Sequence, residues 1–409
     1  MWDVLQTWNI VPAAAMCLFT VAVSTHSMPE RRLQPRHASA ALIATVLTVS
    51  WTVLPRLAWS PVHLLHWLTS RPSTAFMHEA RHYIAPRGTP EVIDANLEKA
   101  VWQRVPWSEA FVEIRGDDAP SGTGPSVEQS TRMKMCWDDD FLYILAVMDV
   151  PAGEELVAKF TARNSPIFHT DSDFEVFIDP AGCNHGYKEL ELNAINTVWN
   201  LMLNRPYSDG GSELSGRVAR PGQANHWDVQ SQRTATRLLR GSLQDATKPS
   251  RWCCEIALSH DDTLAFAPVL GSRPTLGASW RINFSRVEKQ GKVNWVWSPQ
   301  VIWTPKQKRF AGHVNMHLPD AWGYVVFADE SGKLPSTNAP VWRDSTQQAR
   351  QAVMCIYYAV RHYKEQNGEL PRSIEALREL LPSAMPGQPK YVTVQDGSYT
   401  ASVELGDCR

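Results

Sequence analysis

Residues 173–211 read DFEVFIDPAGCNHGYKELELNAINTVWNLMLNRPYSDGG, and polar and apolar residues alternate in the segment YKELELNA at their centre. On a β-strand, this alternation sends the polar side chains to one face and the apolar ones to the other. The polar positions are Tyr187, Glu189, Glu191 and Asn193, and Trp199 follows shortly after. Such a face is expected of a solvated surface, of a pair of catalytic carboxylates, or of a surface that holds a hydroxyl-rich molecule.

The same period of two recurs from about residue 90 to 330. It is found in TRMKMCW, DFEVFID, RWCCEIALS and SWRINFSRV, and WGYVVF is typical of a closing strand. Glycine, proline and aspartate separate these segments, and no helices alternate with them. Many short strands with such turns predict a mainly β fold, a β-sandwich.

The pattern changes after Lys333, where PSTNAP is expected to be a linker. Residues 345–367 have apolar positions at helical spacing, with Ser345 or Thr346 as N-cap and Gly368 as the stop. A second, short helix is expected at 370–381. Two strands around an Asp-Gly turn then predict a hairpin at 390–405. We therefore expect a small α+β appendage at 340–409.

Two apolar runs, 10–23 and 38–54, stand at the start of the sequence, with an arginine-rich stretch between them. One interpretation is a helical hairpin in a membrane with its basic turn in the cytoplasm. Another takes Met28 as the true start, which makes the second run a signal peptide or signal anchor. Both place the remainder on the non-cytoplasmic side, membrane-anchored or secreted. A third is a buried core helix. The expected organisation is an anchor at 1–60, a linker at 61–76, a sandwich at 77–332 and the appendage.

Composition excludes few functions. The formal net charge of −2 gives no reason to expect nucleic acid as a partner. The seven cysteines include no CxxC pair, so neither a zinc site nor a thioredoxin-like site is indicated. The 17 tryptophans are unusual. Tryptophan serves both all-β cores and flat binding platforms, so their number fits either use.

Residues 78–82 read HEARH, which matches the H-E-x-x-H pattern of zinc metallopeptidases. That pattern needs a helix, and Pro86 and Gly88 would end one within a turn. We therefore expect an extended lead-in strand here. The run DDD at 138–140 is expected to be a turn between strands, although acidic turns also bind Ca²⁺.

Five segments resemble one known family. They are STRMKMCWDDDFLYI, DSDFEVFIDPAGCNHGYKELELNAINTVWNLML, SWRINFSRVEK, NWVWSPQ and MHLPDAWGYVVF, in that order. They resemble the family 9 carbohydrate-binding-module-like domains, relatives of the DOMON sandwiches, over about residues 77–330. The resemblance implies an immunoglobulin-like β-sandwich that binds sugars, often beside enzymes that hydrolyse glycosidic bonds. It also implies a glycan end held between two tryptophans, and structural Ca²⁺ in many members. One departure is Ile93-Asp94-Ala95, where many relatives have Ile-Asp-Gly.

A sugar presents C–H faces, on which aromatic rings stack, and hydroxyls, which pair with charged and amide groups. The alternating strand supplies these groups, SWRINFSRV offers partners, and NWVWSPQ offers a second ring. The predicted binding residues for a polysaccharide or oligosaccharide are Tyr187, Glu189, Glu191, Asn193, Trp199, Arg281, Asn283, Trp295 and Trp297. The alternative is that Trp199 and Trp297 are core residues, and that the glutamates pair with Lys188 or Arg281 on a wet face.

A glycoside hydrolase is the second hypothesis. Such enzymes need two carboxyl groups about 5–5.5 Å or about 6.5–9.5 Å apart. Glu189 and Glu191 would stand roughly 6.5–7 Å apart along one strand. However, both would point the same way from one flat strand, whereas catalysis needs them on opposite sides of a scissile bond. Non-catalytic binding, with a role in carbohydrate catabolism, is therefore preferred. A DOMON-like protein-interaction module is the third hypothesis.

Overall fold

The computed structural model describes residues 78–243, 245–267, 271–335, 342–393 and 398–404. All of them belong to one of the two units into which the chain divides, Ala75–Arg409. The anchor expected at 1–60 and the linker expected at 61–76 lie outside the described residues. Among the residues that are described, no helix has the length and apolar character needed to cross a membrane.

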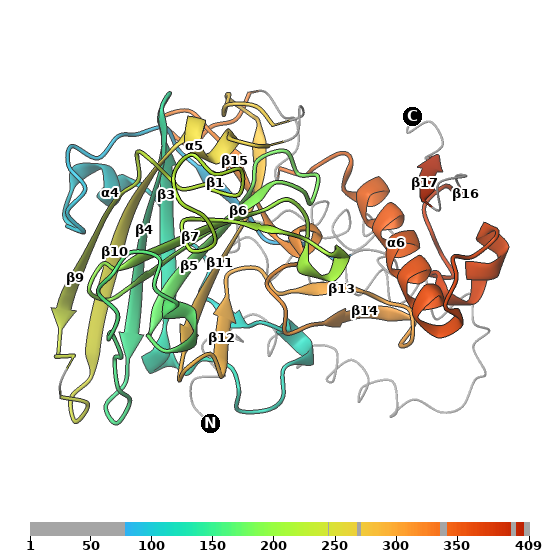
Figure 1. Cartoon of the computed structure of the whole chain (residues 1–409). Helices are drawn as coiled ribbons and strands as arrows, with labels where there is room; N and C mark the ends of the chain where they lie inside the picture. The colour runs from blue at the N-terminus through green and yellow to red at the C-terminus, as the bar shows by residue number, and fades with distance from the viewer. Residues whose placement is uncertain (1–77, 244, 268–270, 336–341, 394–397, 405–409) are drawn as a thin grey trace, which may run out of the picture. The chain divides into compact units, whose positions relative to one another are not determined.

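Four antiparallel strands form one layer (Figure 1). Their order is β3-β4-β10-β9. The strands are β3 Thr131–Trp137, β4 Phe141–Val150, β10 Ser250–Ser259 and β9 Arg233–Arg240. The turn between β3 and β4 is the run of three aspartates, as expected. Asp138 Oδ1 closes it by accepting the backbone N–H of Asp140 at 2.9 Å and that of Phe141 at 2.8 Å.

The second layer is a nine-stranded sheet. Its main order is β1-β15-β11-β5-β6-β7-β8. Beside this order, β12 pairs with β11 on one side and with β2 on the other. The strands are β1 His82–Ala85, β15 Gly323–Phe327, β11 Ser279–Glu288, β5 Asp173–Asp179, β6 Tyr187–Asn193, β7 Val198–Leu203, β8 Glu213–Leu214, β12 Val293–Val296 and β2 Val112–Glu113. Strand β1 begins within HEARH, so this segment leads into an extended strand and not a helix.

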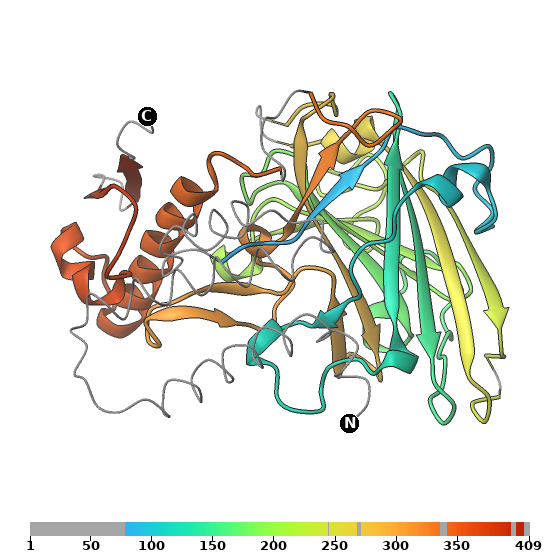
Figure 2. The ribbon, with the colours of Figure 1, turned by 180° about the vertical axis from the view of Figure 1, so that it is seen from behind.

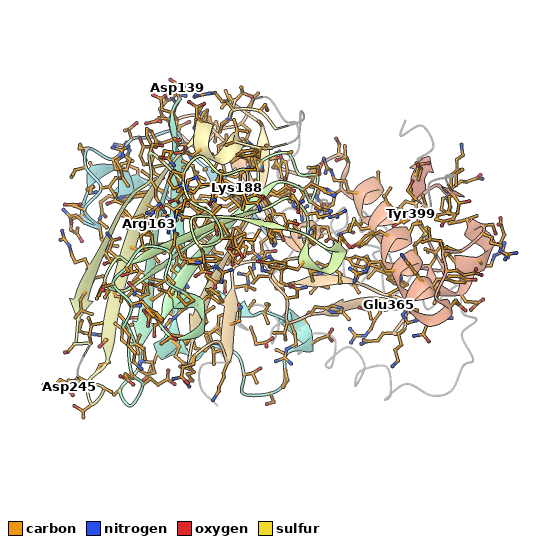
Figure 3. The ribbon with its side chains drawn as sticks, viewed as in Figure 1. Asp139, Arg163, Lys188, Asp245, Glu365 and Tyr399 are labelled. Carbon is orange, nitrogen blue, oxygen red and sulfur yellow. The ribbon has the colours of Figure 1, made fainter. Side chains whose placement is uncertain are left out.

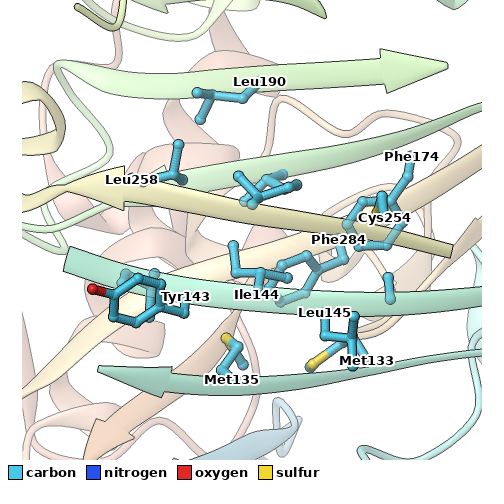
Figure 4. Packing of buried hydrophobic residues seen from close by; sticks show 14 of the residues in the cluster. Met133, Met135, Tyr143, Ile144, Leu145, Phe174, Leu190, Cys254, Leu258 and Phe284 are labelled. Carbon is cyan, nitrogen blue, oxygen red and sulfur yellow. The ribbon is translucent and has the colours of Figure 1, made fainter. Parts of the chain in front are cut away.

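The core lies between the two layers. Figure 4 shows side chains of β3, β4 and β10 facing those of β5, β6 and β11. Phe174 and Phe284, on neighbouring strands, stack with ring centroids 5.8 Å apart. Apart from β4, whose sequence is almost continuously apolar, these strands contribute the apolar positions of their alternating segments. The mainly β fold and the sandwich predicted from period two are therefore confirmed.

Buried Glu255 holds helix α4 and the segment before it against the outer face of the four-stranded sheet. Its carboxylate accepts the Lys99 Nζ at 2.6 Å, the Trp102 Nε1 at 2.7 Å and the backbone N–H of Ala95 at 2.8 Å. These donors lie on helix α4, Ala100–Arg104, and on the segment before it. Ala95 has a positive φ of 57°, a backbone conformation that glycine adopts freely and that is unfavourable for a residue with a side chain.

We expect Glu255→Ala to lower the free energy of unfolding by about 3–5 kcal/mol, because it removes the buried partner of the Lys99 ammonium, leaves that ammonium only the more exposed Asp94, and takes the acceptor from the buried Trp102 indole. Urea denaturation of the parent and the variant measures this. Glu98→Ala, on the exposed side of the same segment, serves as the control and should change the free energy by less than about 0.5 kcal/mol. A loss at Glu255 no larger than that of the control would contradict the assigned role.

The C-terminal elements pack on a small hairpin, β13 Val301–Thr304 with β14 Arg309–Gly312 (Figure 2). Helix α6, Gln347–Asn367, ends at Gly368 as expected, and the second helix is a 3₁₀ turn, Ile374–Leu380. Strands β16 Gln388–Thr393 and β17 Tyr399–Glu404 form the expected hairpin. Trp303 buries its ring here and donates its Nε1–H to the Leu380 carbonyl at 2.8 Å.

Short helical turns connect the remaining strands. They are η3 Gly116–Asp118, η4 Val127–Gln129, η5 Ile167–His169, η6 Tyr207–Asp209, α5 His260–Leu264 and η7 Pro319–Ala321. In η7, Asp320 accepts the hydroxyl of Tyr358, on α6, at 2.9 Å. Its backbone carbonyl accepts Arg281 Nη2 at 2.6 Å, which links α6 to the nine-stranded sheet.

Burial raises the pKa of Asp320 to about 6, so the native protein binds a proton there that the unfolded chain releases near pH 4. The contribution of Asp320 to stability should therefore fall as the pH rises from about 4 to about 6. We expect Asp320→Asn to flatten this part of the stability profile, measured by urea unfolding at several pH values. A profile that runs parallel to that of the parent would contradict this assignment.

Candidate functional site

The face of the nine-stranded sheet that points away from the core carries a row of polar residues. Across β11, β5, β6 and β7, the register aligns Ser285, Glu175, Glu191 and Trp199. In the next row, Glu189 lies between Phe177 and Leu201. Because positions two apart share a face, the strand register alone brings carboxylates of two strands side by side.

This face is covered and not open to water. Apolar side chains collect on it in a cluster of Ile114, Ile167, Phe177, Tyr187, Trp199, Leu201, Leu203, Val296, Met316 and Trp322. Tyr187 lies within this cluster, against the edge of Trp322, and its hydroxyl is 3.0 Å from Nδ1 of His317. Strands β5, β6 and β7 are consequently buried along their whole length.

A cavity of about 290 Å³ opens above the carboxylates. The aromatic side chains of Phe168, Phe177, Trp199 and Tyr207 contribute to its wall. Its polar lining consists of Glu175, Glu189, Glu191, Arg217, Asn294, Asn315 and His317. The cavity therefore combines aromatic rings with hydrogen-bonding groups of both kinds.

Arg217 and His317 are held by neighbours in this wall. Arg217 forms an ion pair with Glu213, and its guanidinium lies 5.3 Å from the ring centroid of Trp199. The ring of His317 packs edge-on against Tyr207, with centroids 4.7 Å apart. Burial lowers the pKa of His317 to about 4, so its imidazole is neutral at physiological pH.

The pKa values of the carboxyl groups in this cavity are raised, whereas the pKa of His317 is lowered. Burial raises the pKa of Glu175 to about 7. Burial, with the neighbouring Glu175 carboxyl, also raises the pKa values of Glu189 and Glu191 well above the ordinary value. Glu189 and Glu191 occupy positions two apart on β6, so their carboxyl groups project from the same face of the sheet.

Four of the predicted binding residues lie together. Glu189, Glu191 and Trp199 line the cavity, and Tyr187 lies beneath them. Asn193, the last polar position of the strand, is fully buried and donates to Asp171 Oδ2 at 2.7 Å and to the Phe160 carbonyl at 2.9 Å. It therefore holds two loops in place and does not reach the cavity.

The other four predicted residues lie elsewhere. Arg281 lines a separate cavity of about 340 Å³ beside α6. Asn283 is buried and donates to the Ser298 carbonyl at 2.8 Å. Trp295 and Trp297 belong to the core between the sheets, and their indole N–H groups donate to Thr123 and Glu109. The alternation of NWVWSPQ sends these tryptophans inward, so the structure does not present them as a second stacking ring on this face.

The alternative of a wet sheet face is wrong for the glutamates. Glu189 and Glu191 keep only 6% and 1% of their surface exposed. Lys188 cannot pair with them, because it lies on the opposite side of the strand and donates to the Gly186 carbonyl at 2.7 Å. Figure 3 shows Lys188 inside the layered part of the molecule, whereas Asp139 and Asp245 stand at its ends.

Several cavity residues escaped prediction. Glu175 occupies a polar position of DFEVFID, as does Asp173 outside the cavity lining, so the alternation that singled out Glu189 would also have found both. Asn294 lies on β12, at the alternate position to Trp295, so the same rule would have found it. The other missed residues lie on loops and short elements far apart in the chain, where no local periodicity exists. They are Phe168, Tyr207, Arg217, Asn315 and His317.

Comparison with known proteins gives distant structural likenesses. No protein-family model and no curated protein matches the chain. A family 9 carbohydrate-binding module from Caldicellulosiruptor kristjanssonii, solved with cellotriose and also with glucose, is 16% identical. The similarity covers 64% of this chain and all of the module, with a TM-score of 0.34.

A putative carbohydrate-binding protein from Bacteroides uniformis is 13% identical over 61% of this chain and all of its own, with a TM-score of 0.41. At these sequence identities, the likenesses assign no roles to individual residues of this chain.

Proposed function

We propose that this protein binds carbohydrate without catalysis, in the cavity on the outer face of the nine-stranded sheet. The observation that carries the proposal is the register of Glu175, Glu191 and Trp199, which sets carboxyl groups and an indole ring side by side in one cavity. A sugar needs this pairing, since each ring has an apolar C–H face and a rim of hydroxyls.

The size of the cavity favours a small part of a glycan. Ligand cavities in proteins commonly span about 300–1,000 Å³, and this one measures about 290 Å³. It suits one sugar unit or the end of a chain better than a long segment of polysaccharide. Tyr207, with 46% of its surface exposed, stands at the rim, where it can stack on the entering sugar.

The polar lining suits hydroxyl groups, which both donate and accept hydrogen bonds. A carboxyl group that keeps its proton does the same, and the raised pKa favours that state for Glu189. Asn294 and Asn315 add amide donors and acceptors. Affinity should be modest, because these bonds replace bonds to water at little net gain.

Glycoside hydrolysis is the second candidate, favoured by carboxyl groups of raised pKa in one cavity. The arrangement argues against it. Glu189 and Glu191 project the same way from one strand, so they do not stand on opposite sides of a scissile bond. A protein-interaction module is the remaining alternative.

We also propose a role in carbohydrate catabolism. The apolar N-terminal runs support a main domain that is membrane-anchored on the non-cytoplasmic side or secreted.

The test is binding of the protein to a glycan array, followed by calorimetry with the best ligand. We expect Tyr207→Ala and Trp199→Ala each to weaken binding by about tenfold or more, because each removes an aromatic wall of the cavity. Trp107→Ala, which truncates a half-exposed tryptophan away from the cavity, is the matched control and should leave affinity unchanged.

Circular dichroism of each variant separates lost binding from lost folding. Tyr207 is exposed, so its truncation should leave the fold intact even if Trp199→Ala does not. If the parent binds no glycan at millimolar concentration, the proposed function is wrong. Release of free sugar from O-glycosyl substrates would instead support the hydrolase.

A further inference from the structure

Three carboxylates meet beneath the floor of the cavity. Asp173, Glu175 and Glu191 each offer an oxygen atom, and these oxygens lie within 4.8 Å of one another. All three side chains are buried, and Asp173 has no exposed surface. They come from β5 and its neighbour β6, where the register pairs Glu175 directly with Glu191.

The hydrogen bonding of these groups is incomplete. Both carboxylate oxygens of Asp173, and Oε2 of Glu191, are buried and have no donor among the described residues. The contrast with Asp171, two residues earlier, is sharp. Asp171 accepts the backbone N–H groups of Lys159 and Phe160 at 3.0 and 3.1 Å and the amide of Asn193 at 2.7 Å. A buried carboxylate oxygen without a donor is costly unless a cation or a proton occupies its lone pairs.

The basic side chains nearby are already paired. Arg286 is bonded to Glu288 at 2.7–2.8 Å and also donates to the Gln129 carbonyl and to Thr131. Arg217 is paired with Glu213. No ion pair joins Asp173, Glu175 or Glu191 to any basic side chain in the described part of the chain. The three carboxylates therefore require a positive charge from outside the protein, or protons.

The spacing suits a metal ion. A Ca²⁺ ion binds oxygen at about 2.3–2.6 Å, so two oxygens in its shell stand at most about 5 Å apart. The three oxygens all lie within 4.8 Å of one another, which falls inside that span. Ca²⁺ also accepts irregular shells of protein oxygens, whereas Mg²⁺ demands near-ideal octahedral geometry and usually keeps several waters. An all-carboxylate set favours hard cations over those that prefer sulfur or imidazole.

We propose that Asp173, Glu175 and Glu191 bind a divalent cation of the Ca²⁺ type beneath the cavity. Glu175 and Glu191 also line the cavity, so the ion lies at its floor and fixes the orientation of both side chains. Ca²⁺ takes about 6–8 oxygens, so water or a sugar hydroxyl completes its shell. The proposed cation site does not depend on the proposed function, whereas an effect of the cation on sugar affinity rests on it.

Terbium luminescence provides the first test, because Trp199 stands beside Glu191 and can sensitise Tb³⁺ bound there. The full-length protein, treated with a chelator, should show saturable Tb³⁺ emission that Ca²⁺ displaces. Asp173→Asn and Glu175→Gln should lose this emission. Glu91→Gln makes the same chemical change on the surface and should keep it. Trp199→Phe should dim the emission.

Thermal unfolding provides a readout independent of tryptophan. At a hundredfold excess over its Kd, Ca²⁺ should raise the Tm of the parent by roughly 5 °C. Asp173→Asn and Glu175→Gln remove repulsion between carboxylates, so they should raise the Tm of the metal-free protein and abolish the response to Ca²⁺. Glu175→Gln alone decides the matter if Asp173→Asn does not fold. A parent without a Ca²⁺ response, or variants that respond like the parent, would overturn the site.

Sugar titrations with Ca²⁺ and with chelator separate the two proposals. We expect sugar affinity to fall by about tenfold when the cation is removed, equivalent to about 1.4 kcal/mol. Sugar binding with no saturable cation binding overturns the cation site and leaves the proposed function standing. Cation binding without binding of any sugar supports the cation site and overturns the function. Sugar affinity that ignores a bound cation overturns the link between them.

Discussion

The central strands of the nine-stranded sheet, β11, β5, β6 and β7, are buried on both faces, and this constraint determines how the rest of the molecule is arranged. One face packs on the four-stranded sheet to form the core, and the other is covered by loops and by an apolar cluster of its own. Strands buried on one face only could leave the polar positions of an alternating sequence in water. Here those positions are enclosed, so each polar side chain on β5 and β6 needs a partner from the protein, a ligand or a proton.

The buried carboxylates of this protein differ in whether hydrogen-bond donors surround their oxygens. Glu255 is surrounded by donors, with an ammonium, an indole and two backbone N–H groups on its oxygens, and it fastens the cover of the four-stranded sheet. Asp173 and Glu191 are equally buried yet keep oxygens without donors. Unsatisfied buried groups are uncommon in native proteins and concentrate where a site has a task beyond stability. The difference between these groups is a local argument for function that does not depend on resemblance to other proteins.

The sequence allowed the layers to be predicted, because alternation is a local property. Phe174, Leu190 and Phe284 occupy apolar positions and do face the core, as the period of two requires. The same rule placed Glu189 and Glu191 on the other face. It could not predict whether that face is wet or covered, since the cover comes from Phe168, Trp322 and other residues distant in sequence. Nor could it indicate that Trp295 and Trp297 point inward, because a tryptophan suits a core and a sugar platform equally.

Core and site depend on one and the same strand register. Glu175 faces Glu191 across β5 and β6, while Phe174 faces Leu192 one position away on the core side. A slip of one residue would move every apolar side chain of a strand out of the core and every carboxylate into it. The hydrophobic packing that sets this register therefore also assembles the acidic floor of the cavity. Repulsion among the carboxylates opposes folding, and the buried apolar area of the same strands offsets that cost. A cation bound between them would act in the same direction as the core, by stabilising the only register in which the three carboxylates meet.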